Sequence, residues 1–98
     1  MCPVMTLDEL KASLSSDVPP VDVPAVQALW HDARGDWDRA HRIAQEIAAA
    51  DGSWVHAYLH RKEGDLSNAG YWYRRAGKAN PSVPLGEEWE QIAEALLG

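Results

Sequence analysis

One motif occurs twice in this sequence, as ALWHDARGDWDRA at residues 28–40 and as AYLHRKEGDLSNA at residues 57–69. A glycine can end a helix in the left-handed conformation, and an aspartate directly after it can cap the next helix. We therefore expect two copies of a helix-turn-helix unit, 29 residues apart. The pairs that match are Ala28/Ala57, His31/His60, Gly35/Gly64, Asp36/Asp65 and Ala40/Ala69.

Apolar residues at helical spacing extend from the motif in both directions, and no segment alternates between polar and apolar residues as a strand does. A helical hairpin cannot bury its own apolar face, so the two units are expected to stack as antiparallel hairpins. The pattern predicts helices over residues 6–15, 24–34, 37–51, 54–63, 66–80 and 84–97. We expect one all-α domain, 1–98, divided into an N-terminal cap helix with a proline-rich linker (1–23), repeat units 24–52 and 53–81, and a C-terminal capping helix (82–98).

The composition excludes several classes of protein. The 98 residues are 46% hydrophobic and 24% charged, which is typical of a folded domain. The net charge of −6 has the wrong sign for nucleic acid or an anionic membrane as partner. The single cysteine, Cys2, rules out an internal disulfide and a cysteine metal cage. With neither a basic leader nor an apolar span, we expect a cytoplasmic protein.

Two short segments resemble the tetratricopeptide repeat. Residues 35–40 and 64–69 look like that family's turn into its second helix, and residues 72–76 are similar to the Sel-one-like variant. The resemblance covers residues 24–81 and implies a short solenoid whose concave face binds a protein or peptide. Further matches in the second unit are Tyr73, Ala76 and Pro81.

The aromatic residues support a binding role. There are five Trp, three Tyr and no Phe, so every ring has a polar group, and Trp, Tyr and Arg are enriched at interfaces. We expect a non-enzymatic interaction module whose partner is a protein or peptide, including a second copy of the chain. Nucleotide and hydrolase motifs do not occur. The resemblance places the binding groove at Leu29, Asp32, Trp54, Tyr58, Arg61 and Lys62, and we add the nearby Trp72.

The second unit is locally basic within an acidic chain. Its cationic side chains indicate either a surface for an acidic partner or a solvated face that complements a helix C-terminus. The residues concerned are Arg61, Lys62, Arg74, Arg75 and Lys78, against Glu63 and Asp65.

Histidines suggest an alternative function. His56, His60 and Glu63 follow one another at i, i+4 and i+7, so they lie along one stripe of a helix, at a spacing compatible with metal ligands. His31 is the repeat equivalent of His60 and is expected to approach the same stripe. The alternative function is therefore a divalent-metal or catalytic site at these four residues; otherwise the two repeat-equivalent histidines fill the same packing position in each unit.

Overall fold

The computed structural model describes residues 5–97, which form six α-helices and one short 3-10 helix and no strand. The predicted all-α fold is therefore confirmed for this part of the chain, and Cys2 lies outside it. No helix among these residues combines the length and the apolar character needed to cross a lipid bilayer. The elements are α1 (Leu7–Ala12), η1 (Ser13–Ser15), α2 (Pro24–Ala33), α3 (Trp37–Glu46), α4 (Ala50–Lys62), α5 (Leu66–Ala76) and α6 (Leu85–Leu97).

The two repeated turns have the same conformation. Gly35 and Gly64 adopt φ values of 87° and 91°, as the sequence predicts. The Asp36 carboxylate accepts the backbone N–H of Arg39 at 3.2 Å, and the Asp65 carboxylate accepts that of Asn68 at 3.2 Å. Each glycine thus avoids the steric cost of a left-handed residue with a side chain, and each aspartate caps the following helix.

The third helix was predicted to end near residue 51, and this is wrong. It ends at Glu46, because Ile47 is extended, and α4 already begins at Ala50. Gly52 lies inside the first turn of α4, where an added Cβ would meet the Cβ of Ile47 at 2.5 Å. Its function is therefore to let α4 pass close to Ile47 rather than to stop a helix. The fifth helix also ends before residue 80, at Ala76, followed by Gly77 with positive φ.

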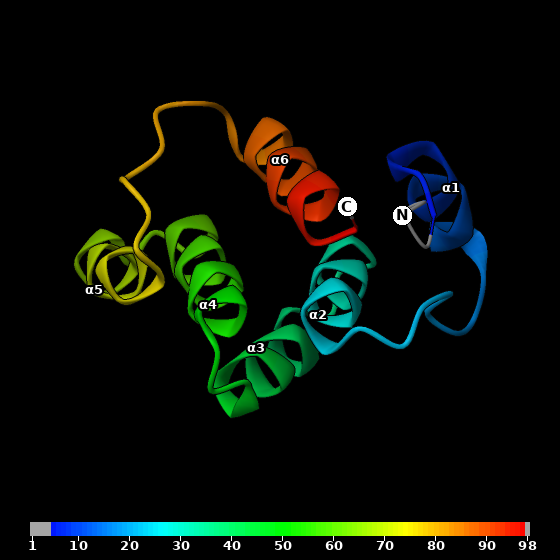
Figure 1. The fold of residues 1–98 in the computed structure, drawn as a ribbon, viewed down its shortest axis with the longest axis horizontal. Coiled ribbons are helices and arrows are strands. Elements are labelled where there is room, and N and C mark those ends of the chain that lie inside the picture. Colours follow the sequence, from blue (N-terminus) through cyan, green and yellow to red (C-terminus); the bar gives the residue numbers. More distant parts are fainter. Residues whose placement is uncertain (1–4, 98) are drawn as a thin grey trace.

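The helices form two hairpins that lie side by side (Figure 1). Helix α2 packs on α3 and α4 packs on α5, and α3 joins the two hairpins by packing on α4. The last helix does not continue this row past α5. It crosses back and packs against α4 and α2, with α1 against its other side.

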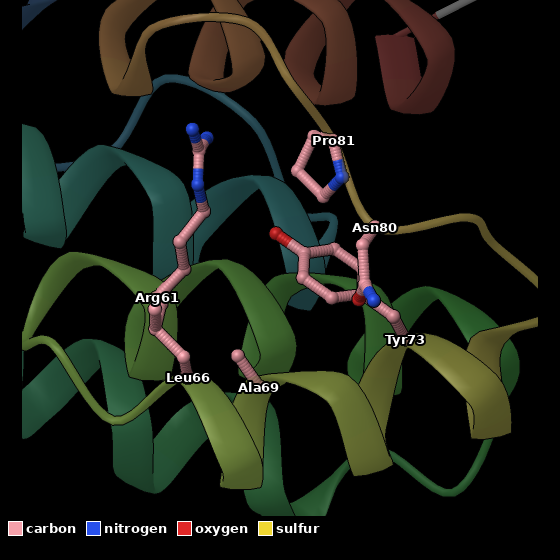
Figure 2. Close-up of a pocket in the computed structure, with 6 residues that line it drawn as sticks. All are labelled: Arg61, Leu66, Ala69, Tyr73, Asn80 and Pro81. Atoms are coloured by element: carbon pink, nitrogen blue, oxygen red, sulfur yellow. The ribbon is translucent and has the colours of Figure 1, made fainter.

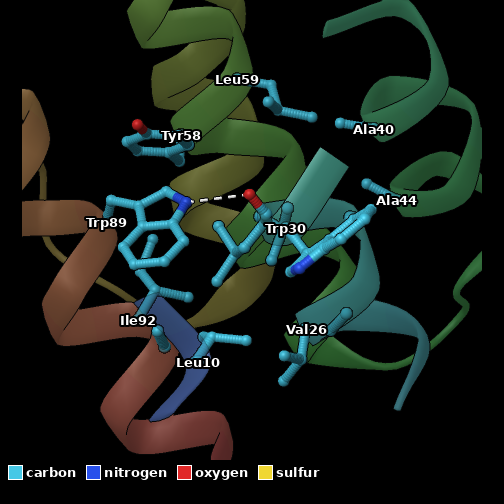
Figure 3. Packing of buried hydrophobic residues seen from close by; sticks show 14 of the residues in the cluster. Leu10, Val26, Trp30, Ala40, Ala44, Tyr58, Leu59, Trp89 and Ile92 are labelled. Atoms are coloured by element: carbon cyan, nitrogen blue, oxygen red, sulfur yellow. Dashed lines mark hydrogen bonds between the residues drawn. The ribbon is translucent and has the colours of Figure 1, made fainter. Parts of the chain in front are cut away.

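The core lies where α2, α4 and α6 meet (Figure 3). The Trp89 indole N–H of α6 donates to the Leu29 carbonyl of α2 at 3.0 Å, and the Trp30 indole N–H donates to the Ser13 hydroxyl at 3.2 Å. Burial of large apolar side chains is the main stabilising term, and each of these two rings also has its polar atom satisfied. The largest fully buried apolar residues are Trp30, Leu10, Leu29, Leu59, Ile92, Val26 and Val55.

Candidate functional site

Three histidine side chains converge between α3 and α4. His41 comes from α3, and His56 and His60 come from successive turns of α4. One ligand nitrogen from each ring lies within 4.8 Å of one from each of the other two. The ring centroids are 4.6 Å apart for His41 and His56, 4.7 Å for His56 and His60, and 5.1 Å for His41 and His60. We call these three residues the histidine cluster.

Local structure explains why the cluster forms. Two residues four apart on a helix lie on the same face, which brings together the two histidines of α4. His41 follows Trp37 by four residues, on the side of α3 that packs on α4. The close approach of Gly52 to Ile47 lets the two helices lie near each other after a short connection.

Two of the three rings are buried, His41 is partly exposed, and His56 has one unsatisfied polar atom. His56 is 5% exposed and His60 is 7% exposed. The Nδ1 atom of His56 is buried without a hydrogen-bond partner. Burial, followed by the nearby His41 and His60, lowers the pKa of His56 to about 4. Burial also lowers the pKa of His41, so these two imidazoles are neutral at physiological pH, the form that binds metal ions.

A carboxylate orients one of the rings. Glu63 Oε2 lies 2.6 Å from His60 Nδ1. A carboxylate that accepts one ring N–H fixes the tautomer and leaves the other nitrogen with a free lone pair. Glu63 is therefore placed to support His60 as a ligand through Nε2. A second group, His60 with Glu63 and Asp65, also has ligand atoms within 4.8 Å of one another. It is less suited to metal, because both its carboxylates are exposed and Asp65 already caps α5.

Two tryptophans enclose the cluster. The Trp37 ring stacks on His41 at 4.9 Å and 12°, and the Trp72 ring stacks on His56 at 3.9 Å and 16°. The indole N–H of Trp37 donates to the Leu59 carbonyl at 2.9 Å, so it is satisfied by the backbone of α4 and not by a histidine. The cluster is thus walled by aromatic faces.

His31 is not part of this cluster, and the expectation that it approaches His60 is wrong. Its ring lies edge-on to Trp30 at 5.0 Å, beside a hollow of about 220 Å³ that Asp17, Arg34 and Arg39 also line. His60 faces His41 of the preceding helix α3, whereas His31 lies beside Asp17 of the N-terminal segment. His41 is not among the ligands expected from the sequence; its spacing of four residues from Trp37 places it on the same face of α3 but does not show that this face meets α4.

The expected binding groove is covered by α6. Leu29 and Tyr58 are buried, and Asp32 is buried and paired with Lys62 at 3.1 Å. Arg61 pairs with the buried Glu88 of α6 at 2.8 Å. Of the seven residues expected in the groove, Lys62 is exposed, and Trp54, Arg61 and Trp72 are partly exposed.

A cavity of about 420 Å³ lies between α4, α5 and the segment before α6 (Figure 2). The Tyr73 hydroxyl on its wall donates to the Glu88 carboxylate, and the Arg61 guanidinium binds the other Glu88 oxygen. Burial, and then this hydrogen bond, raise the pKa of Tyr73, so its hydroxyl stays protonated. Two of the polar side chains that line the cavity, Arg61 and Tyr73, are thus already paired within the protein.

No protein-family model matches this chain, and no curated protein or solved structure is significantly similar to it. The function is therefore inferred from the geometry of the histidine cluster alone.

Proposed function

We propose that this protein binds a divalent transition-metal ion through His41, His56 and His60, with Glu63 holding His60 in position. The observation that carries this proposal is the buried Nδ1 atom of His56, which has no partner and lies among two further imidazoles. An unpaired buried polar group costs about 1 to 3 kcal/mol. A metal ion bound by the cluster would use such lone pairs and offset that cost.

The distances between the three imidazole rings are close to those expected for a zinc ion with three histidine ligands. For zinc–nitrogen distances of 2.0 to 2.1 Å and tetrahedral angles, the ligand nitrogens lie about 3.3 Å apart and the ring centroids roughly 5 Å apart. The observed centroid distances of 4.6 to 5.1 Å agree with this spacing. Ion binding therefore requires the ligand nitrogens, which lie within 4.8 Å of one another, to approach to about 3.3 Å by rotation of the rings.

The donor set selects a class of metal. Neutral imidazole suits zinc, cobalt, nickel and copper, whereas magnesium and calcium prefer oxygen ligands. We therefore expect zinc-class ions to bind and calcium to leave the protein unchanged.

The histidine cluster also has a defined place in the proposed repeat architecture. We propose that α2–α3 and α4–α5 are two short tetratricopeptide-like units, supported by the matching turns at Gly35 and Gly64. On this interpretation the ion links the second helix of one unit to the first helix of the next, and metal binding stabilises the junction between the units.

The experiment is a thermal-shift titration of tag-free, chelator-treated protein with zinc. A ligand at 100 times its dissociation constant adds about 2.7 kcal/mol, which raises the melting temperature by roughly 10 to 20 °C. His41→Gln should abolish the shift, and the matched control His31→Gln should retain it, because His31 lies outside the cluster. Equal shifts in both variants would contradict the proposal.

A second candidate function, binding of an acidic protein segment, is supported by the outer face of α5. Tyr71 is 44% exposed, and the Arg75 guanidinium lies over the rings of Tyr71 and Trp72 at 5.8 and 5.2 Å. Exposed Arg74 and Lys78 add positive charge to this face. Aromatic rings beside cations are typical of interface hot spots.

A backbone NMR titration with a short polyglutamate peptide tests this second function. We expect shifts at Tyr71 and Arg75 that Arg75→Glu removes, whereas the distant Lys11→Glu should not change them. Shifts spread over unrelated cations would contradict a specific surface, and new signals in the absence of peptide would instead indicate a second copy as partner.

A further inference from the structure

The histidine cluster supplies three ligands and no fourth. Among residues 5–97, the group able to share an ion at this place contains His41, His56 and His60 and no cysteine or carboxylate. Glu63 contacts the cluster, but its Oε2 atom is held at 2.6 Å by His60 Nδ1. A zinc-class ion with three histidine ligands completes its tetrahedral coordination with a ligand from solution.

The walls of the cluster do not supply a fourth donor. Trp37 and Trp72 present ring faces to His41 and His56, and the one indole N–H of Trp37 is used by the Leu59 carbonyl. An indole N–H is in any case a donor and cannot bind a cation. The accessible side lies towards His41 and Trp72, which are partly exposed, whereas His56 and His60 are buried.

The charge of the site favours an anion at the remaining position. Neutral imidazoles do not reduce the charge of the bound ion. The one nearby carboxylate that contacts the cluster, Glu63, binds His60 and contributes a single negative charge. A divalent ion thus leaves a net positive centre in surroundings of low polarity, where electrostatic attraction is strong. The Trp37 and Trp72 rings stack on His41 and His56, which favours a small ligand at this position.

We infer that a metal ion held by His41, His56 and His60 keeps one open coordination position, which takes a small anion such as azide or a carboxylate group. This inference rests on the proposed metal-binding function. It defines the ligand class of the site as small anions that coordinate metal through nitrogen or oxygen, and it distinguishes an open centre from a closed structural one.

Cobalt(II) is the probe, because its visible d–d bands report coordination number and ligand exchange. Tag-free protein is loaded with one equivalent of cobalt(II) in chloride-free buffer and titrated with sodium azide. We expect intense bands on loading, and a saturable change in their position and intensity with one azide per cobalt. Cobalt in buffer with azide alone is the reference, and circular dichroism of the loaded protein checks that the helices are intact.

Two other outcomes distinguish the open coordination position from metal binding itself. Strong cobalt bands that do not respond to azide would overturn the open position while the proposed metal binding stands. Absence of protein-dependent cobalt bands would overturn both.

Discussion

The imidazole ring of His41 stands edge-on to that of His56, with the centroids 4.6 Å apart and the planes at 89°, although the two residues belong to different helices. Neither ring could be placed there by its own helix. Their contact depends on the packing of α3 against α4. A change that moves these two helices apart would therefore disrupt the histidine cluster even if all three histidines were kept.

The first prediction concerns pH and the metal-free protein. The pKa of His56 is lowered from 6.5 to about 4 in the folded state, mainly by burial. Between these pH values the unfolded chain binds more protons at this residue than the folded protein does, so stability falls as the pH falls. The full difference is about 3 kcal/mol and is reached near pH 4.

Urea unfolding from neutral pH to pH 4, with chelator present, measures this loss. Over this pH range the free energy of unfolding of the His56→Gln variant should fall by about 3 kcal/mol less than that of the wild type. Parallel pH profiles for the two proteins would show that His56 titrates normally in the fold.

The second prediction concerns two glycines within helices. Gly52→Ala should destabilise the protein by about 1 to 3 kcal/mol, because the added Cβ would meet Ile47 Cβ at 2.5 Å and its carbonyl oxygen at 2.6 Å. Gly86→Ala is the control, since nothing lies within 4 Å of its added Cβ, and it should be neutral or stabilising by up to about 1 kcal/mol. Melting temperatures that change equally in the two variants would refute the role of Gly52.

The third prediction concerns two glutamates of α6. Glu88 is 2% exposed and is held by Arg61 and Tyr73, so Glu88→Gln should cost about 3 kcal/mol by leaving the Arg61 charge without its partner. Glu90 forms an exposed pair with Lys11 at 2.9 Å, and Glu90→Gln should cost no more than about 1 kcal/mol. Chemical unfolding of both variants gives the comparison, and a smaller loss for Glu88→Gln than for Glu90→Gln would be the contrary result.

The fourth prediction concerns the repeated turn. Gly64→Val should cost about 1 to 2 kcal/mol, because residue 64 has φ of 91°. Asp65→Ala should cost about 0.5 to 2 kcal/mol through the lost cap on Asn68. The same changes at Gly35 and Asp36 should have similar effects if the two units are equivalent. Unaltered melting temperatures in the Gly64 and Asp65 variants would contradict the assignment of this turn.

The sequence predicts the features that depend on neighbouring residues. Gly35 and Gly64 identify both turns, and the four-residue spacing of His56 and His60 identifies two of the three residues of the histidine cluster, because one helix carries both. His41 could not be found in this way, since its approach depends on how closely α3 passes α4. Likewise, the amphipathic pattern of α6 shows that one face is buried, but not that it is buried against α2 and α4.

X-ray absorption at the zinc edge of stoichiometrically loaded protein tests the central claim most directly. We predict three imidazole nitrogens at about 2.0 to 2.1 Å, with outer-shell scattering from their rings and one further light ligand. His41→Gln should reduce the imidazole count by one, and His31→Gln should leave it unchanged. A first shell of oxygen alone, or the same imidazole count after His41→Gln, would contradict a metal site in the histidine cluster.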